Sequence, residues 1–271
     1  MNYINMKVII LTISATAVLA IGGARAQVLI NDTDWTGATL SGTTLSGGAN
    51  AGNYLAINNN QTAITVSGSN LAINSNGGNV VYRAFDEGSL APDKHTLSGW
   101  AVGEGLSFTV TVAINASAES SQFSLGFASD TAKTSLYVMD CPIAYNSSVK
   151  SRDSALMGQN GMSFAGTDFA ERTILKDQQF HDVTFSITAN GDSNYTFKYL
   201  IDSTELLNKS VQVNSVVTGY ALDGIAFRGE TFSYTISGVN VTVIPEPSAA
   251  VLLGVGAGLL AVTALIRRRQ G

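Results

Sequence analysis

Apolar and polar residues alternate along several stretches of the chain, most clearly from Leu106 to Ile114. Every second position from 106 to 114 is apolar, while positions 107, 109 and 111 carry Ser or Thr. Because successive side chains of a strand point to opposite faces, this period of two predicts a strand with one buried and one wet face. The same alternation predicts strands at 123–127, 183–187, 195–201 and 232–236.

Two local signals refine this pattern. Asn190-Gly191 lies between two predicted strands and would supply the positive φ angles of a hairpin connection. In the last strand the apolar positions are even up to Ile236 and odd from Val239 on, so the phase slips at Ser237-Gly238. One extra residue there keeps both halves facing the core, which predicts a β-bulge; a strand break with a turn is the alternative.

The first part of the body contains a short repeat. Leu55-Ala-Ile-Asn recurs at Leu71, which is too few copies for a solenoid and predicts two short strands that end in Asn-rich turns. Thr62–Val66 and Asn79–Arg83 are predicted as further short strands. No stretch of the body has a sustained helical period, and only a short helical turn is considered, between residues 203 and 218.

Many two-faced strands separated by Gly, Asn and Ser turns predict an all-β fold, an antiparallel β-sandwich over residues 27–243. The run of strands that ends in Tyr234–Val243 loosely resembles concanavalin A-like jelly rolls. That resemblance implies that the first and last strands lie in one sheet, with Ala38–Leu40 near Val239–Val243.

The N-terminus has the pattern of a secretory signal peptide. Lys7 is followed by the apolar run Val8–Ile21 and by Ala24-Arg25-Ala26, a small-x-small cleavage site before Gln27. A permanent N-terminal anchor would need a longer apolar run. We therefore expect residues 1–26, a signal helix, to be removed on export.

The C-terminus has the pattern of a single transmembrane helix. The run Ala249–Ile266 has eighteen residues with Thr263 as its only polar side chain. Such a helix is about 27 Å long, enough to cross the hydrocarbon core of a bilayer. Three arginines follow it and only Glu246 precedes it, so the positive-inside rule places the C-terminus in the cytoplasm.

The last 28 residues also resemble a known sorting signal. Pro245-Glu246-Pro247, the apolar span and Arg267, Arg268 and Arg269 occur in the order seen in PEP-CTERM sorting signals of Gram-negative bacteria. The resemblance covers residues 244–271 and implies an exosortase-like enzyme as partner, which processes the protein near the triplet. It implies an inner-membrane intermediate with the body in the periplasm, and then a cell-surface or extracellular location.

Composition limits the partners of the body. Between residues 27 and 244, 10 of the 15 basic and 19 of the 20 acidic residues remain, a formal charge of −9. This charge disfavours nucleic acids and anionic membrane surfaces as partners. Cys141 is the only cysteine, so no intramolecular disulfide forms, and its apolar neighbours predict a buried, inert thiol.

No catalytic set is evident in the sequence, which predicts a protein that is not an enzyme. Asp32 and Asp34 are the only carboxylates two apart, no Glu-x-Asp-x-x-Glu pattern of glucan hydrolases follows, and Glu104 stands alone. His95 is expected in a solvated loop and His181 at a half-buried strand end, without a Gly-x-Ser-x-Gly elbow or zinc-ligand spacing. A glycosidase without a recognisable motif stays as an alternative.

Ligand binding is the other alternative. No cofactor is predicted except calcium, for which the oxygen-rich segments 31–34, 86–87 and 190–192 are candidate loops, although such clusters are usually turns. Trp35 and Trp100 are candidate glycan contacts, or else they plug the ends of the core, while Tyr195, Phe197 and Tyr199 are predicted core residues.

The leading hypothesis is therefore an exported, surface-sorted, non-enzymatic β-sandwich protein of the cell envelope or extracellular matrix. A lectin-like module that binds extracellular polysaccharide is the second hypothesis, and a glycoside hydrolase the third.

Overall fold

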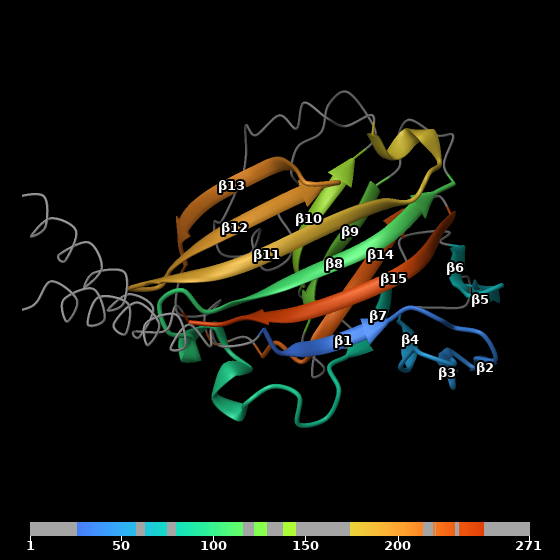
Figure 1. The fold of residues 1–271 in the computed structure, drawn as a ribbon, viewed down its shortest axis with the longest axis horizontal. Helices are drawn as coiled ribbons and strands as arrows, with labels where there is room; N and C mark the ends of the chain where they lie inside the picture. Colours follow the sequence, from blue (N-terminus) through green and yellow to red (C-terminus); the bar gives the residue numbers. More distant parts are fainter. Residues whose placement is uncertain are drawn as a thin grey trace, which may run out of the picture. The chain divides into compact units, whose positions relative to one another are not determined.

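The computed structural model describes residues 26–57, 63–74, 80–115, 122–128, 138–144, 174–213, 219, 221–230 and 233–246 (Figure 1). Val28–Ile244 forms one compact unit. The predicted signal helix up to residue 25 and the predicted span 249–266 lie outside the described residues. In the part that is described, no helix has the length and apolar character to cross a membrane.

The body consists of two antiparallel sheets. The first has the strand order β13-β12-β11-β8-β15-β6-β5, with β1 paired to β15 beside this path. Its strands are β1 (Val28–Asp32), β5 (Ala63–Ser67), β6 (Asn70–Asn74), β8 (Gly105–Ile114), β11 (His181–Gly191), β12 (Asn194–Ile201), β13 (Thr204–Gln212) and β15 (Ser233–Ile244).

The second sheet has the order β10-β9-β14-β7-β4-β3-β2. Its strands are β2 (Thr39–Ser41), β3 (Thr44–Ser46), β4 (Tyr54–Ile57), β7 (Val80–Ala84), β9 (Gln122–Ala128), β10 (Val138–Ala144) and β14 (Gly224–Glu230). Three short 3-10 helices are described on the connections: η1 (Pro92–Lys94), η2 (Leu97–Gly99) and η4 (Ile174–Asp177).

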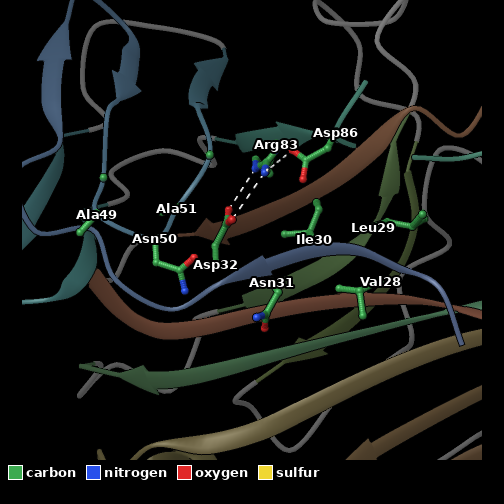
Figure 2. A pocket seen from close by; sticks show the side chains of 12 residues that line it. Val28, Leu29, Ile30, Asn31, Asp32, Ala49, Asn50, Ala51, Arg83 and Asp86 are labelled. Atoms are coloured by element: carbon green, nitrogen blue, oxygen red, sulfur yellow. Dashed lines mark hydrogen bonds and ion pairs between the residues drawn. The ribbon is translucent and has the colours of Figure 1, made fainter. Parts of the chain in front are cut away.

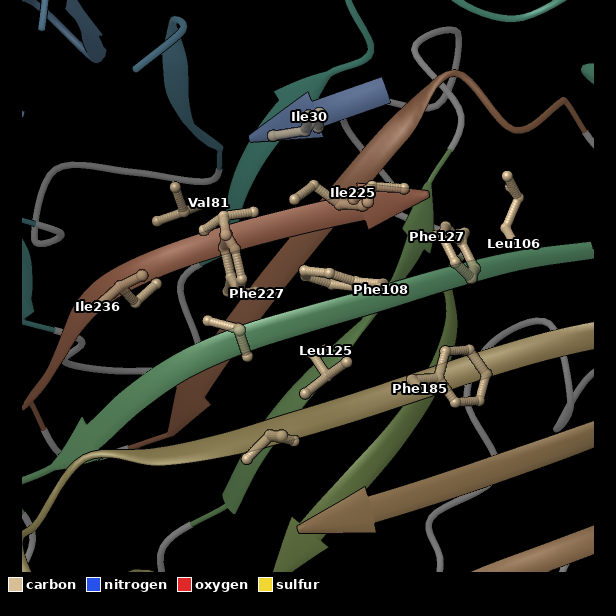
Figure 3. Close-up of a cluster of buried hydrophobic side chains, with 14 of the residues drawn as sticks. Ile30, Val81, Leu106, Phe108, Leu125, Phe127, Phe185, Ile225, Phe227 and Ile236 are labelled. Atoms are coloured by element: carbon tan, nitrogen blue, oxygen red, sulfur yellow. The ribbon is translucent and has the colours of Figure 1, made fainter. Parts of the chain in front are cut away.

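The core lies between the two sheets (Figure 3). Phe108 of β8 packs against Phe127 of β9 and Phe227 of β14, with ring centroids 6.1 and 5.4 Å apart. Each of these rings is fully buried, which stabilises the fold by about 1.5–3 kcal/mol per side chain. The predicted β-sandwich is therefore confirmed for the described residues.

The alternation predicted a strand at 106–114, and the observed strand β8 is Gly105–Ile114, one residue longer. Tyr195, Phe197 and Tyr199 lie in the core as predicted. The bulge in β15 is confirmed, because Ile236 pairs with Val112 and Gly238 with Thr111, which leaves residue 237 as the extra one.

The hairpin between β11 and β12 forms where it was predicted, but with a different turn. Positive φ angles occur at Gly191, Asp192 and Ser193, so the expectation for Asn190 was wrong. Asp192-Ser193 forms the two-residue turn, and the register between the strands is irregular beside Gly191.

The expected pairing of Ala38–Leu40 with the last strand was also wrong. The strand beside β15 is β1, whose Ile30 pairs with Val241, while β2 pairs with β3 in the other sheet. The physical reason is burial: beside β15, β1 brings Leu29 and Ile30 into the core, where they are at most 1% exposed, whereas Ala38–Leu40 offers one large apolar side chain, Leu40, which is 49% exposed.

The helical turn considered between residues 203 and 218 is not found in the described part of that range. Residues 204–212 form β13, because Asp202 and Ser203 adopt positive φ and reverse the chain into a hairpin, while residues 214–218 lie outside the described residues. The repeated Leu-Ala-Ile-Asn segments are strands, as predicted. They lie in different sheets: Leu71 of β6 is buried in the core, whereas Leu55 of β4 packs on a small separate cluster.

Candidate functional site

Two strands direct charged residues into the space between the sheets. On β1, Asp32 follows Ile30 by two residues, and on β7, Arg83 follows Val81 by two residues. Since alternate residues of a strand share a face, Asp32 and Arg83 point the same way as their buried apolar neighbours. They are the buried charged residues of the described chain, 5% and 6% exposed.

The two charges meet in an ion pair that links the sheets (Figure 2). Nε of Arg83 donates to Oδ2 of Asp32 at 3.0 Å, and Nη2 donates to Oδ1 of Asp86 at 2.8 Å. The hydroxyl of Tyr54, on β4, donates to Oδ2 of Asp32 at 2.7 Å. Nη1 of Arg83 also donates to the carbonyl of Ala84. A buried charge requires such partners, because an unpaired one costs several kcal/mol.

Burial and charge act together on the protonation of this cluster. Burial works against the positive charge of Arg83, but the hydrogen bonds and charges of Asp32 and Asp86 outweigh it and raise the pKa of Arg83. Burial, together with the neighbouring Asp32 carboxylate, raises the pKa of Tyr54 well above its ordinary value. Tyr54 therefore stays a neutral hydrogen-bond donor to Asp32.

A glycine makes room for the guanidinium. A Cβ atom on Gly52 would lie 2.1 Å from both Cζ and Nη2 of Arg83 and 2.4 Å from Nε. The guanidinium thus rests on the backbone of residue 52, and any side chain there would displace it. The position of the loop 48–52 and the position of the Arg83 side chain therefore depend on each other.

A cleft of about 480 Å³ opens beside this loop and Arg83. Its walls are β1, the loop Gly48–Gly52, Arg83 and Asp86. Asn50 holds the loop in place: its N–H donates to the Asp34 carbonyl at 2.9 Å, and its Nδ2 donates to Oγ1 of Thr33 at 2.6 Å. The cleft has the volume of a small-molecule site and offers fixed carboxylate, amide and main-chain groups.

The structure brings two of the proposed calcium loops together, but the positive charge between their aspartates is the guanidinium of Arg83. Asp32 from segment 31–34 and Asp86 from segment 86–87 both bind Arg83. In the third segment, Nδ2 of Asn190 donates to Asn194 and Thr196, and Asp192 lies in the hairpin turn. Across the described ranges, no group of three or more His, Cys, Asp or Glu gathers in a metal-binding arrangement.

Trp35 and Trp100 have different surroundings. Trp35 is 0% exposed and packs on Tyr54 with ring centroids 5.9 Å apart, so its proposed role as a glycan contact was wrong. A buried ring has no face free for a sugar. Trp100 is half-buried against the core, and its indole N–H donates to the Lys94 carbonyl at 2.9 Å. For Trp35 the alternative reading as a core residue is the one observed.

Both histidines bind aspartates. His95 lies in the loop between η1 and η2, as expected, but its side chain is only partly solvated: Nδ1 lies 3.0 Å from Oδ1 of Asp223. His181 begins β11 as a largely covered strand end, as predicted, with its ring between Asp177 and Asp202. Glu104, which looked isolated in the sequence, forms an ion pair with Lys94.

The sorting residues fall mostly outside the described chain. Pro245 and Glu246 follow β15 directly, and Ala26 and Gln27 precede β1. The remaining predicted residues lie outside the described ranges, namely Ala24, Pro247, Arg267, Arg268 and Arg269. Cys141 pairs opposite Leu125 in the β10–β9 ladder, and the predicted burial of its thiol lies outside what is described.

Asp32, Tyr54, Arg83 and Asp86 were missed as a group in the sequence. The signal is a phase anomaly: in Ile30-Asn-Asp32 and Val81-Tyr-Arg83 a charged residue occupies the position that alternation assigns to the core. Two inward charges of opposite sign in separate strands indicate a buried ion pair. Their partners, Tyr54 and Asp86, carry no such signal.

No protein-family model matches the chain, and no curated protein matches its sequence. Among solved structures, it is similar to the CBM2 module of the evolved Dit of Lactobacillus casei BL23 phage J-1, at 9% identity and a TM-score of 0.46, over 83% of this chain and 99% of that one. It is similar to the carbohydrate esterase vb_24B_21 from Shiga toxin-encoding bacteriophage phi24B, at 11% identity and a TM-score of 0.45, over 82% and 100%.

The Lotus tetragonolobus seed lectin is another neighbour, at 10% identity and a TM-score of 0.43, over 80% of this chain and 99% of that one. Since these identities are near one in ten and the TM-scores are below 0.5, the chemistry of the site is argued from the residues of this chain alone.

Proposed function

We propose that the chain is an exported, surface-sorted, non-enzymatic β-sandwich protein of jelly-roll type that binds glycans through the cleft beside Arg83. The observation that carries this proposal is the cleft itself, with about 480 Å³ of space and walls of fixed polar groups. A site of this size accommodates one to a few sugar units. Asp86 and Asn50 supply hydrogen-bonding groups at its edge.

Pre-formed geometry supports binding. Asp32 holds Arg83 and Tyr54, Arg83 holds Asp86, and Asn50 ties its loop to residues 33 and 34. Side chains that are already fixed lose little conformational freedom when a ligand arrives, which favours affinity.

The same contacts argue against hydrolysis. A glycosidase needs two carboxylates that flank one bond and act as separate acid and base or nucleophile. Here the Asp32 side chain is only 7% exposed and is bonded to both Arg83 and Tyr54, so it has no free access to a substrate. Among the described residues that line the cleft, Asp86 is the one exposed carboxylate.

Export and sorting are supported by the sequence at both ends of the body. The cleavage pattern Ala24-Arg-Ala26 lies just before β1, and the Pro-Glu-Pro triplet begins at the residue after β15. Processing at either end would leave the strands β1 and β15 whole. The proposed partners are an exosortase-like enzyme, the membrane through residues 249–266, and an extracellular polysaccharide.

Glycan binding is tested with the full chain in a detergent that has no sugar headgroup, on a glycan array and by calorimetry. We expect binding that Asn50→Ala and Asp86→Ala each weaken about five- to tenfold, as for the loss of one good hydrogen bond to a charged or fixed group. Glu87→Gln is the matched control, because this neighbour of Asp86 does not line the cleft. No binding by the wild-type protein, or equal effects of all three variants, would reject the site.

Hydrolysis is tested on the same preparation. Turnover of polysaccharides or esters that a single carboxylate or histidine substitution abolishes would make the protein an enzyme and reject the proposal.

Sorting is tested by mass spectrometry of the protein recovered from the cell surface. We expect an N-terminus at Gln27 and a C-terminus near residues 245–247. Deletion of residues 249–271 is expected to release a folded body into the periplasm, whereas an insoluble truncated body would show that the span belongs to the fold.

A further inference from the structure

We infer that the cleft takes glycans that carry hydroxyl or protonated amino groups and excludes glycans with carboxylate or sulfate groups, with Asp86 as the group that selects. This inference rests on the proposed glycan-binding function and adds the class of glycan. It depends on which polar groups of the cleft are already bonded and which face the solvent.

Among the described residues that line the cleft, Arg83 is the one cation, and it is not available to an anion. Nε of Arg83 is bonded to Asp32, Nη1 to the Ala84 carbonyl, and Nη2 to Asp86 at 2.8 Å and to Asp32 at 3.5 Å. Recognition of a carboxylate or sulfate by arginine requires a free fork of two parallel N–H donors. Asp32 already occupies that fork from Nε and Nη2, and only 7% of the side chain is exposed.

The exposed group of the cluster is an acceptor. The Asp86 side chain is 64% exposed, although one of its oxygens accepts from Arg83. A carboxylate accepts up to about four hydrogen bonds, so positions remain for donors from a ligand. Sugar hydroxyls and ammonium groups donate such bonds, whereas a second carboxylate or a sulfate at this position only repels.

The charge of the surroundings acts in the same direction. Asp32, Arg83 and Asp86 together carry a formal charge of −1, and residues 27–244 carry −9. A negative potential at the cleft lowers the local concentration of anionic ligands and raises that of cationic ones. The expected order of affinity is amino sugar, then neutral sugar, then acidic sugar.

The experiment compares three oligosaccharides of equal length with the full chain by calorimetry: a glucosamine oligomer, a neutral glucan oligomer and a uronic acid oligomer. At low salt we expect the glucosamine and glucan oligomers to bind, and the uronic acid oligomer to bind up to about fivefold more weakly than the glucan, which is the upper size of one exposed charge interaction. Added salt should narrow these differences.

Charge reversal at Asp86 provides the decisive variant. Asp86→Lys should weaken the glucosamine oligomer and strengthen the uronic acid oligomer, while the glucan changes little beyond the loss of one hydrogen bond. Glu87→Lys is the matched control with the same change of net charge outside the cleft lining. A thermal unfolding curve for each variant shows that it is folded.

The outcomes separate the two claims. Tightest binding of the uronic acid oligomer by the wild-type protein, or an unchanged order in Asp86→Lys, overturns the charge selection and leaves the glycan-binding function standing. If the control Glu87→Lys shifts the order as much as Asp86→Lys, the overall charge selects and the role of Asp86 is rejected. Binding of none of the three oligomers overturns both claims.

Discussion

The contact of His181 with two aspartates predicts a defined dependence of stability on pH. Nε2 of His181 lies 2.9 Å from Oδ1 of Asp177, and Nδ1 contacts Oδ2 of Asp202. A neutral imidazole has one N–H donor, whereas the imidazolium has two, so only the protonated ring donates to both carboxylates. These two contacts connect η4, which holds Asp177, and the β12–β13 turn, which holds Asp202, to the start of β11.

The sign of the effect follows from the shifted pKa. Burial by itself lowers the pKa of His181, but the hydrogen bonds and charges of Asp202 and Asp177 outweigh it, so the pKa is raised above its usual value of 6.5. A raised pKa in the folded state means that the stabilisation is complete below about pH 6.5 and is lost as the pH rises through the folded-state value. The Gln179 N–H and His181 lower the pKa of Asp177 below its usual 3.8. The stability that the ionised Asp177 contributes is therefore present above about pH 3.8 and is lost as the pH falls further, which sets the acid limit of the window.

The magnitude is modest because the aspartates are accessible. Charged hydrogen bonds contribute about 1.5–3 kcal/mol in protected sites, but exposed ion pairs contribute only about 0.2–1 kcal/mol. His181 is 12% exposed, whereas Asp177 and Asp202 are 51% and 46% exposed, so we take about 1 kcal/mol for the protonated His181. In a domain of this size that corresponds to about 2–4 °C in Tm.

The assay is thermal unfolding of the wild type and His181→Gln, followed by circular dichroism at constant ionic strength. Glutamine stays neutral, so the wild type should be more stable by about 2–4 °C near pH 5.5, and this gap should close toward pH 9. The other histidine is present in both proteins, so the difference isolates His181. A gap that stays constant or grows with pH, or that about 1 M salt leaves unchanged, would refute the reasoning.

Three further predictions concern the charged cluster. Arg83→Met should destabilise the fold by about 3–5 kcal/mol in urea unfolding because it leaves Asp32 buried and unpaired, and an effect below about 1 kcal/mol would contradict that view. Adding Asp32→Asn to Arg83→Met should recover part of the loss, so a double-mutant cycle should give a coupling of about 0.5–3 kcal/mol, and purely additive effects would show that the two side chains do not interact. Gly52→Ala should cost about 1–3 kcal/mol and weaken glycan binding, because its Cβ would meet Arg83 at 2.1 Å. Gly68→Ala is the comparison for binding only: a Cβ there meets nothing within 4 Å, although the positive φ of 64° makes the substitution strained, and glycan affinity should stay unchanged.

Much of the fold was determined by the local pattern of the sequence. Alternation over Leu106–Ile114 places a strand without reference to its neighbours, because the covalent geometry of an extended chain fixes which side chains share a face. The phase slip at residue 237 predicts the bulge for the same reason. The list of core residues on these strands follows directly, and most of them are buried as expected.

Only the tertiary structure decided which strands are neighbours and which polar residues meet. Several short strands could pair with β15, and β1 is the one that does. The local sequence of residues 38–40 does not show that another strand takes this place. The sequence left Trp35 open as a glycan contact or a core residue, and the structure places it in the core against Tyr54. Asp32 and Arg83, which both line the cleft, are 51 residues apart in sequence, and folding brings them to 3.0 Å. The local period of two determines to which face of the strand a side chain points. Which residue it meets there depends on how distant strands pack in the folded chain.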